Sequence, residues 1–231
     1  MDECKRGFAS RYIHKHGHAD SKATFKGNAR HEEYEKMVYE PGFIPIPPTD
    51  MSPAEKKSMD KATRYVDDFL KEMRLMGGTL KPEVWVAINR DGSPSKYGAP
   101  IPPYIRVKTD LYWSSASGKT LGTFDWKSGT WMPDESEVDY TQTILTSIAL
   151  LKSKPNVKRV IGGILYTAKQ RKFPISVMRE EIESPHGRVQ DVLVAMANYE
   201  EIQRVGDYSE ATRGRWCAFC RDVSCAYHPS I

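Results

Sequence analysis

The sequence predicts an α/β protein with a mixed central sheet flanked by helices. Four segments rich in β-branched and aromatic residues indicate strands, and the third and fourth are separated by a segment of helical length. A long segment after residue 52 repeats apolar residues every three or four positions, which is typical of an amphipathic helix. Strands joined partly by a hairpin and partly by a helix indicate a mixed sheet with helices packed on it.

The clearest predicted helix follows Ser52. Ser52 and Glu55 form a capping-box pattern, Pro53 suits the first helical position, and Gly77-Gly78 ends the segment. We expect its apolar stripe to face the core. The stripe consists of Met59, Ala62, Val66, Phe69, Leu70, Met73 and Met76.

Three further helices are expected: one at 30–37, which comes after Gly27, one at about 135–151 and one at about 188–202. The last of them is expected to bury Val189, Val192, Leu193 and Met196. The predicted strands span 84–88, 104–113, 120–126 and 157–166. The turn residues 114–118 suggest that the second and third strands form an antiparallel hairpin.

The length and composition indicate one domain over residues 1–231. A chain of 231 residues with 39% hydrophobic content can bury one sizeable core. The sequence has no run of about 20 apolar residues, and its polar start lacks the apolar core of a signal peptide. We therefore expect a cytoplasmic protein with no membrane partner.

The net charge of +4 is too small to establish a nucleic-acid partner, but basic residues cluster locally. Two clusters could flank a phosphate backbone, although ordinary solvated surface explains any single member about as well. The first comprises Lys5, Arg6, Arg11, Lys15, Lys22, Lys26 and Arg30, and the second Lys152, Lys154, Lys158, Arg159, Lys169, Arg171 and Lys172.

The third predicted strand carries a pair of residues suited to hydrolytic chemistry. Side chains alternate along a strand, so Asp125 and Lys127 project to the same side as Thr123. Asp125 could hold a divalent cation, while Lys127 could orient or help deprotonate water and balance charge on a phosphate. Asp110 lies on the preceding strand, and hairpin pairing would let its carboxylate share an ion with Asp125. Mg²⁺ suits such oxygen ligands.

This ordered set of residues resembles the PD-(D/E)XK nuclease superfamily, and within it the RecB-like exonucleases, including the iron–sulfur CRISPR-associated and AddB-type members. The family's Gly-x-x-x-His helix is matched by Gly27 to His31, its strand-end aspartate by Asp110, and its acidic-x-Lys strand by Asp125-Trp126-Lys127. The helix that follows supplies Gln142, but Thr146 occupies the position of the family's tyrosine.

The resemblance implies a restriction-endonuclease-like core and a Mg²⁺- or Mn²⁺-dependent deoxyribonuclease that hydrolyses phosphodiester bonds at DNA ends. It implies that His31, Asp110, Asp125 and the carbonyl of Trp126 bind the metal. Lys127 would be the catalytic lysine, assisted by the two aspartates and by Gln142.

The same resemblance names DNA as the partner. Tyr140, a possible substitute for the family's tyrosine, Trp131 and Arg30 are the residues we expect to contact it. The ring of Trp131, which lies beside a predicted turn, could stack on the bases of a single strand. Some members of the superfamily form rings, so the resemblance is also compatible with a homo-oligomer. Partner proteins of DNA recombination or repair are compatible with it as well.

Four cysteines lie near the two ends of the chain. Three of them, Cys217, Cys220 and Cys225, fall within nine residues, and Cys4 lies at the other end. Such spacing in a reducing compartment indicates metal or cluster ligation. In the cluster-bearing family members this layout holds a four-iron, four-sulfur cluster that joins the termini, which would staple Cys4 to the 217–228 segment. Zinc remains the alternative, with His228 as the fourth ligand.

A second class of function stays open beside the nuclease. The chain would then be a non-catalytic nucleic-acid-binding module that keeps the fold and a structural zinc or iron–sulfur site. The presence of Asp110, Asp125 and Lys127 argues against it. A zinc-dependent hydrolase built on the cysteines fares worst, because three thiolates and a histidine leave no open position for water.

Overall fold

The computed structural model describes residues 22–96, 98 and 103–205. Residues Lys22–Gln190 form one compact unit, which contains the whole sheet. Helix α5 (Arg188–Val205) passes at Asp191 into a second unit, and its residues up to Val205 are the only part of that unit described. The start of α5 agrees with the helix expected at 188–202, whereas the single domain over residues 1–231 stays a prediction.

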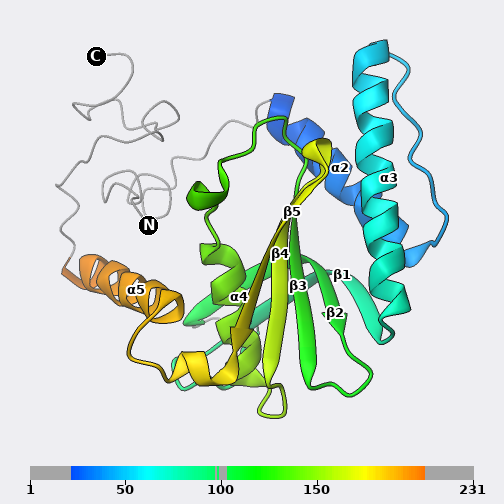
Figure 1. Ribbon diagram of the computed structural model, residues 1–231. Coiled ribbons are helices and arrows are strands. Elements are labelled where there is room, and N and C mark those ends of the chain that lie inside the picture. Colours follow the sequence, from blue (N-terminus) through cyan, green and yellow to red (C-terminus); the bar gives the residue numbers. More distant parts are fainter. Residues whose placement is uncertain (1–21, 97, 99–102, 206–231) are drawn as a thin grey trace, which may run out of the picture. The chain divides into compact units, whose positions relative to one another are not determined.

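A five-stranded mixed sheet forms the centre of the larger unit (Figure 1). The strands follow one another in the order β1-β2-β3-β4-β5, and only β3 and β4 pair in parallel. Their bounds are β1 (Thr79–Ile88), β2 (Ile105–Ser114), β3 (Thr120–Lys127), β4 (Arg159–Tyr166) and β5 (Arg171–Met178). The expected α/β class, mixed sheet and β2–β3 hairpin are confirmed.

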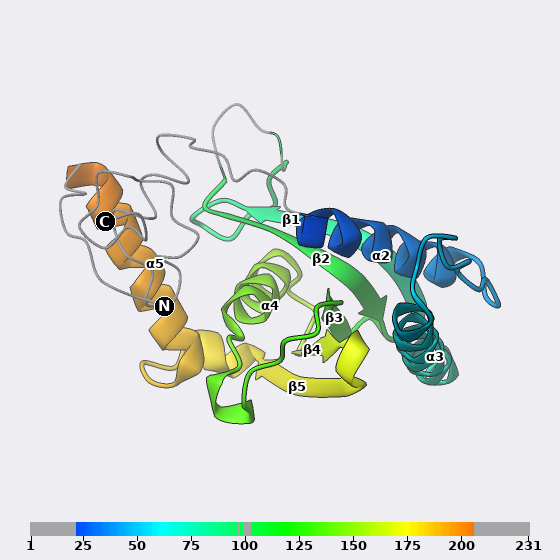
Figure 2. The ribbon, with the colours of Figure 1, turned by 90° about the horizontal axis from the view of Figure 1, so that it is seen from above.

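Helices cover both faces of this sheet. The sheet curves around α4 (Thr141–Ser153), while α2 (Lys22–Tyr39) and α3 (Pro53–Leu75) lie on its outer face (Figure 2). Helix α4 links β3 to β4, and such a crossover lets two successive strands run in parallel. Within the described part of the chain, every helix is too short or too polar to cross a membrane.

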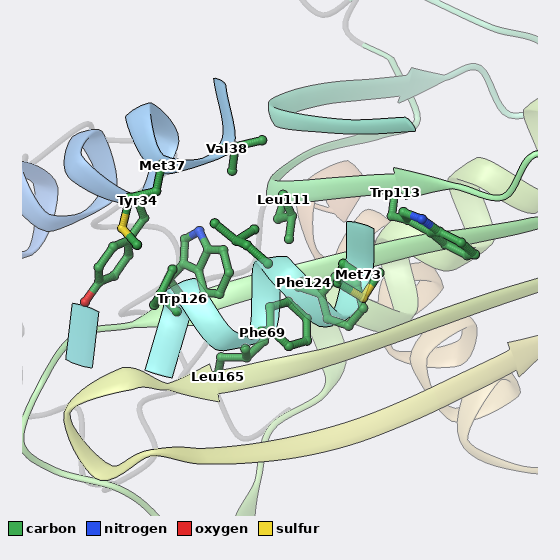
Figure 3. Packing of buried hydrophobic residues seen from close by; sticks show 12 residues of the cluster. Tyr34, Met37, Val38, Phe69, Met73, Leu111, Trp113, Phe124, Trp126 and Leu165 are labelled. Carbon is green, nitrogen blue, oxygen red and sulfur yellow. The ribbon is translucent and has the colours of Figure 1, made fainter. Parts of the chain in front are cut away.

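The core on the outer face is built from aromatic rings of α2, α3 and β3 (Figure 3). The ring of Trp126 is almost fully buried and meets Tyr34 and Phe69 edge-to-face, with centroid distances of 5.7 and 5.9 Å. Each such pair contributes about 0.5–1.5 kcal/mol beyond the burial of its surface. Trp126 is therefore a core residue, and α2 is thereby held against the strand that carries Asp125.

Helix α3 agrees closely with its predicted bounds. Ser52 Oγ accepts from the backbone N–H of Glu55, whose carboxylate accepts in return from the N–H of Ser52. The predicted stripe is buried except at Met76, which is 51% exposed. Met76 is the C-cap, and the helical turn that would bring it over the core ends before it.

Several other boundaries were predicted wrongly, and one strand was not predicted. Helix α2 begins at Lys22, so Gly27 lies inside it and does not mark its start. The helix expected from residue 135 begins only at Thr141, because the short 3₁₀ helix η2 (Glu135–Glu137) ends in the extended residue Val138. Strand β5 was missed altogether. Its Pro174 disfavours a central strand, but β5 is an edge strand, where proline is tolerated.

Strand β2 changes face at Asp110. In a regular strand Thr109 and Leu111 would point to the same side. Here Thr109 Oγ1 lies 2.7 Å from Oγ1 of Thr123, whereas Leu111 packs in the outer core with Phe124. Because Thr123 and Phe124 are neighbours in β3 and point to opposite faces, the alternation of β2 is interrupted between Thr109 and Leu111.

Glu83 of β1 lies opposite this interruption. Its neighbours Pro82 and Val84 pair with Leu111 and Thr109, which flank Asp110. Glu83 has φ 49°, a left-handed conformation that a residue with a side chain seldom adopts. Its carboxylate pairs with Lys108 of β2. The change of face in β2 therefore coincides with a left-handed residue in β1.

Substitution at Glu83 tests this conformation. We expect the Glu83→Val variant to be less stable than the Glu83→Gly variant by about 1–2 kcal/mol, because a β-branched residue is strained at positive φ and glycine is not. Both variants lose the ion pair with Lys108, so each serves as the control for the other. The measurement is the free energy of unfolding in urea. A valine variant as stable as the glycine variant would contradict the left-handed conformation, since regular strands favour valine.

Candidate active site

The carboxylate of Asp125 and the ammonium of Lys127 form an ion pair at the end of β3. Asp125 Oδ2 lies 2.7 Å from Lys127 Nζ. The side chain of Asp125 is only 13% exposed, whereas that of Lys127 is 47% exposed. Asp125 Oδ2 is buried and accepts no well-aligned hydrogen bond from the described residues, so the ammonium is its chief compensation. The prediction that these two side chains share one side of the strand is confirmed.

Asp110 binds the end of β3 directly. Regular pairing of β2 with β3 stops at Leu111 and Phe124, and beyond it Asp110 Oδ2 accepts from the backbone N–H of Trp126 at 2.9 Å. The carboxylate thus takes the place of a main-chain carbonyl where the two strands separate. The negative charge of Asp110 also reaches Asp125, where it raises the pKa.

His31 faces the other oxygen of Asp110. Its Nδ1 lies 3.5 Å from Asp110 Oδ1, so a residue of α2 joins the two strands at this point. One turn further along α2, the Tyr34 hydroxyl donates to Thr167 Oγ1 at 3.1 Å, and Thr167 Oγ1 lies 3.5 Å from the carbonyl of Lys127. This chain of contacts holds the histidine helix against the lysine strand.

Burial dominates the electrostatics of Asp125. Desolvation raises the pKa of its carboxyl, Lys127 opposes this shift, and the nearby charge of Asp110 adds to it. The net result is a pKa above the ordinary range, so the ionised carboxylate is disfavoured in the folded protein. A divalent cation beside both aspartates would relieve that penalty.

The pKa values of Lys127 and His31 are also raised, but for these two bases a raised pKa favours the charged form. Burial alone would lower the pKa of the Lys127 ammonium, but its contact with Asp125 outweighs burial and raises it. Burial likewise opposes a charged His31 imidazole, while its contact with Asp110 and the charges of both aspartates raise the pKa of His31 above 6.5. The two aspartates therefore favour the charged form of both groups.

The donor atoms of this cluster are of the kinds that bind divalent cations such as Mg²⁺ or Mn²⁺. Two carboxylates and one imidazole supply oxygen and nitrogen ligands, and one of the carboxylate oxygens is buried without a well-aligned donor. Among the described residues, no three His, Cys, Asp or Glu side chains are already gathered as metal ligands. In this structure the carboxylates are instead paired with His31 and Lys127.

The remaining expected site residues occupy different surroundings. Gln142, at the start of α4, is exposed and donates from Nε2 to the carbonyl of Lys108 at 3.2 Å. This bond joins α4 to β2 next to Asp110, and no described contact joins Gln142 to Asp125 or Lys127. The predicted catalytic role of Gln142 therefore stays a prediction, and its present contact is structural.

The three predicted DNA contacts differ in how far they are accessible. Trp131, four residues after Lys127, is 66% exposed. Tyr140 packs against a small apolar cluster that includes Tyr166, and Arg30 pairs with Glu33 on its own helix. Trp131 is thus the most exposed of the three residues.

The sequence did not indicate that Tyr34, Thr167 and Tyr166 support the site. Tyr166 pairs in register with Lys127, and burial raises the pKa of its phenol while Lys127 opposes that shift. The spacing of Tyr34 one turn after His31 was visible, but nothing near Thr167 in the sequence indicated its contact with α2. Cys4, Cys217, Cys220, Cys225 and His228 lie outside the described residues.

No protein-family model matches this sequence, and no curated protein matches it either.

The pKa of His31 gives a direct test of the cluster. We expect a value above 6.5 in the chelated wild-type protein, measured by NMR titration of the imidazole. The Asp110→Asn variant removes the acceptor and its charge but leaves burial, so its His31 pKa should fall below the wild-type value. Asp125→Asn, which removes only a more distant charge, is the matched control and should shift it less. Equal shifts in the two variants would contradict the contact between His31 and Asp110.

Proposed function

We propose that this protein is a divalent-metal-dependent DNA nuclease whose active site is the cluster of His31, Asp110, Asp125 and Lys127. The observation that carries the proposal is the convergence of two carboxylates and a lysine where β2 and β3 separate. One of the carboxylates is buried in a state that costs free energy, and strongly perturbed carboxylates of this kind concentrate at functional sites.

The cation would be held by Asp110 and Asp125, with His31 as the nitrogen ligand and the carbonyl of Trp126 as a further expected ligand. When bound, it would supply Lewis-acid stabilisation of the negative charge that develops on a phosphate. The Trp126 peptide is fixed by its hydrogen bond to Asp110, and its indole is anchored in the core. This rigid backing keeps the two carboxylates in place.

Lys127 acts in this proposal through its charge. Its raised pKa keeps the ammonium protonated at neutral pH, which favours electrostatic stabilisation of the phosphate over the role of a base. Nearly half of the side chain is exposed, so the ammonium can turn from Asp125 to a substrate. Trp131, exposed and close behind in the sequence, is the best supported surface for stacking on a base.

Action on DNA ends rests on the resemblance to RecB-like exonucleases. The cysteine-ligated staple also belongs to the proposal, and the spacing of Cys217, Cys220 and Cys225 supports it. An iron–sulfur cluster would give the purified protein a brown colour and broad visible absorption, whereas zinc would give neither.

The decisive experiment compares cleavage by the wild type and by Lys127→Ala. Linear and circular DNA, single- and double-stranded, are incubated with Mg²⁺ or Mn²⁺. We expect the wild type to degrade only DNA with ends, and Lys127→Ala to lose at least a hundredfold in rate because transition-state charge is left unbalanced. Lys119→Ala, an exposed lysine at the other end of the same hairpin, is the control and should cleave normally.

A measurement of metal binding shows whether Lys127→Ala has lost only catalysis or the whole site. The Lys127→Ala protein should bind Mn²⁺ at least as tightly as the wild type in calorimetry, because the competing ammonium is gone. If the wild type cleaves no substrate with either metal, the nuclease is excluded and the non-catalytic nucleic-acid-binding module takes its place. Cleavage of closed circles would exclude strict dependence on ends.

Stability without metal gives an independent check on Asp125. Since its pKa is raised on folding, the neutral form stabilises the fold at low pH, and that stability is lost as the pH rises through the folded-state pKa. At pH 7 we therefore expect the Asp125→Asn variant to melt at a higher temperature than the chelated wild type, with the difference vanishing below about pH 4. Added Mn²⁺ should raise the melting temperature of the wild type only. A less stable Asp125→Asn variant at pH 7 would contradict the buried-charge penalty.

A further inference from the structure

The outer face of the sheet is covered unevenly. Helices α2 and α3 lie over its β1–β3 side, and within the unit Lys22–Gln190 Figure 2 shows no α-helix outside β5. The outward residues of β5 reflect this, because Lys172 and Pro174 are exposed while the inward Phe173 and Ile175 are buried. An open sheet face beside a helix leaves room for a ligand.

A pocket of about 440 Å³ occupies this position, which lies within the size range of small-molecule sites. One wall is the C-terminal half of α3, the floor comes from β3, β4 and β5, and three cations stand around it with one carboxylate. The apolar lining includes Met73, Met76, Phe124, Ile161 and Pro174, and the charged lining is Glu72, Arg159, Lys172 and Arg188.

Two of the cations meet at a single residue of β5. Arg159 Nε donates to Ser176 Oγ at 2.8 Å, and Arg188 donates from Nη2 to the carbonyl of Ser176. The Nη groups of Arg159 donate to no acceptor among the described residues, whereas Arg188 also lies 3.7 Å from Glu181. Two guanidinium groups held in this way present forked donors, which match the oxygens of a phosphate.

The third cation lies at the opposite end of the lining. Lys172 Nζ stands 5.3 Å from the ring centroid of Phe69 and 4.0 Å from Glu72 Oε2. Between the cations, the exposed side chains of Met76 and Pro174 and the half-buried Ile161 offer an apolar surface. A ligand with an anionic group and a flat apolar ring satisfies both parts of the pocket.

We propose that this pocket binds a phosphorylated nucleoside, with the phosphate at Arg159 and Arg188 and the base against Met76 and Pro174. The ligand is either a free mononucleotide or the phosphorylated terminal nucleotide of a strand. The pocket is separate from the carboxylate cluster, because Phe124 lines it while the adjacent Asp125 points to the other side of β3. Binding therefore needs neither the metal nor cleavage.

Calorimetry on the full-length protein in EDTA tests the proposal, with deoxyadenosine 5′-monophosphate as the probe. We expect the Arg159→Ala/Arg188→Ala double variant to bind at least tenfold more weakly, the loss of one to two charged hydrogen bonds. Met76→Asp, a change at an exposed position that should leave the fold intact, should weaken binding to a similar extent, because it removes the apolar contact with the base and adds negative charge beside an anionic ligand. Lys81→Ala, which removes an exposed lysine of β1 outside the pocket, should bind like the wild type.

Three results would overturn the proposal. Deoxyadenosine binding as tightly as its monophosphate would exclude the phosphate contact, and inorganic phosphate competing equally would exclude the base contact. Wild-type affinity in Met76→Asp would place any binding elsewhere, and this readout stands even if the double variant fails to fold. Competition by a 5′-phosphorylated oligonucleotide identifies a strand end as the ligand, whereas competition by mononucleotides alone identifies a free nucleotide. Because divalent ions are chelated, a failed nuclease assay leaves this test unaffected.

Discussion

The carboxylate of Asp110 accepts the backbone N–H of Trp126 at the point where β2 and β3 cease to pair, and the candidate site depends on this hydrogen bond. A side chain here does the work of a strand carbonyl, so the sheet can open without leaving a buried donor unsatisfied. The opening exposes one end of β3, where Asp125 and Lys127 lie. The other oxygen of Asp110 remains available to His31.

Burying the charged cluster costs folding free energy, and the packing of the aromatic core beside it offsets that cost. Trp126 is buried between Tyr34 and Phe69 on one side of β3, while its neighbours Asp125 and Lys127 carry charge on the other. Packing on the core side fixes the strand, which prevents the carboxylates from relaxing into water. The strain of a left-handed Glu83 and the desolvation of Asp125 thus occur in one place, as is usual where structure is maintained for function.

Most of the fold could be predicted from local patterns. The capping box at Ser52, the apolar stripe of α3 and the β2–β3 hairpin follow from spacing alone, and the pairing of Asp125 with Lys127 follows from strand alternation. The same rule could not place Asp110, because the alternation of β2 is interrupted there by long-range contacts. Strand β5 escaped prediction since its proline is acceptable only at an edge, a position that sequence does not reveal.

The central claim is that Asp110 and Asp125 hold a divalent cation beside Lys127. The most direct measurement is a crystal structure of the protein grown with Mn²⁺, with anomalous differences used to locate the ion. The account predicts an anomalous peak within bonding distance of a carboxylate oxygen of each aspartate, with Lys127 Nζ moved away from Asp125. A fully occupied ion elsewhere, with the Asp125–Lys127 pair unchanged, would contradict it.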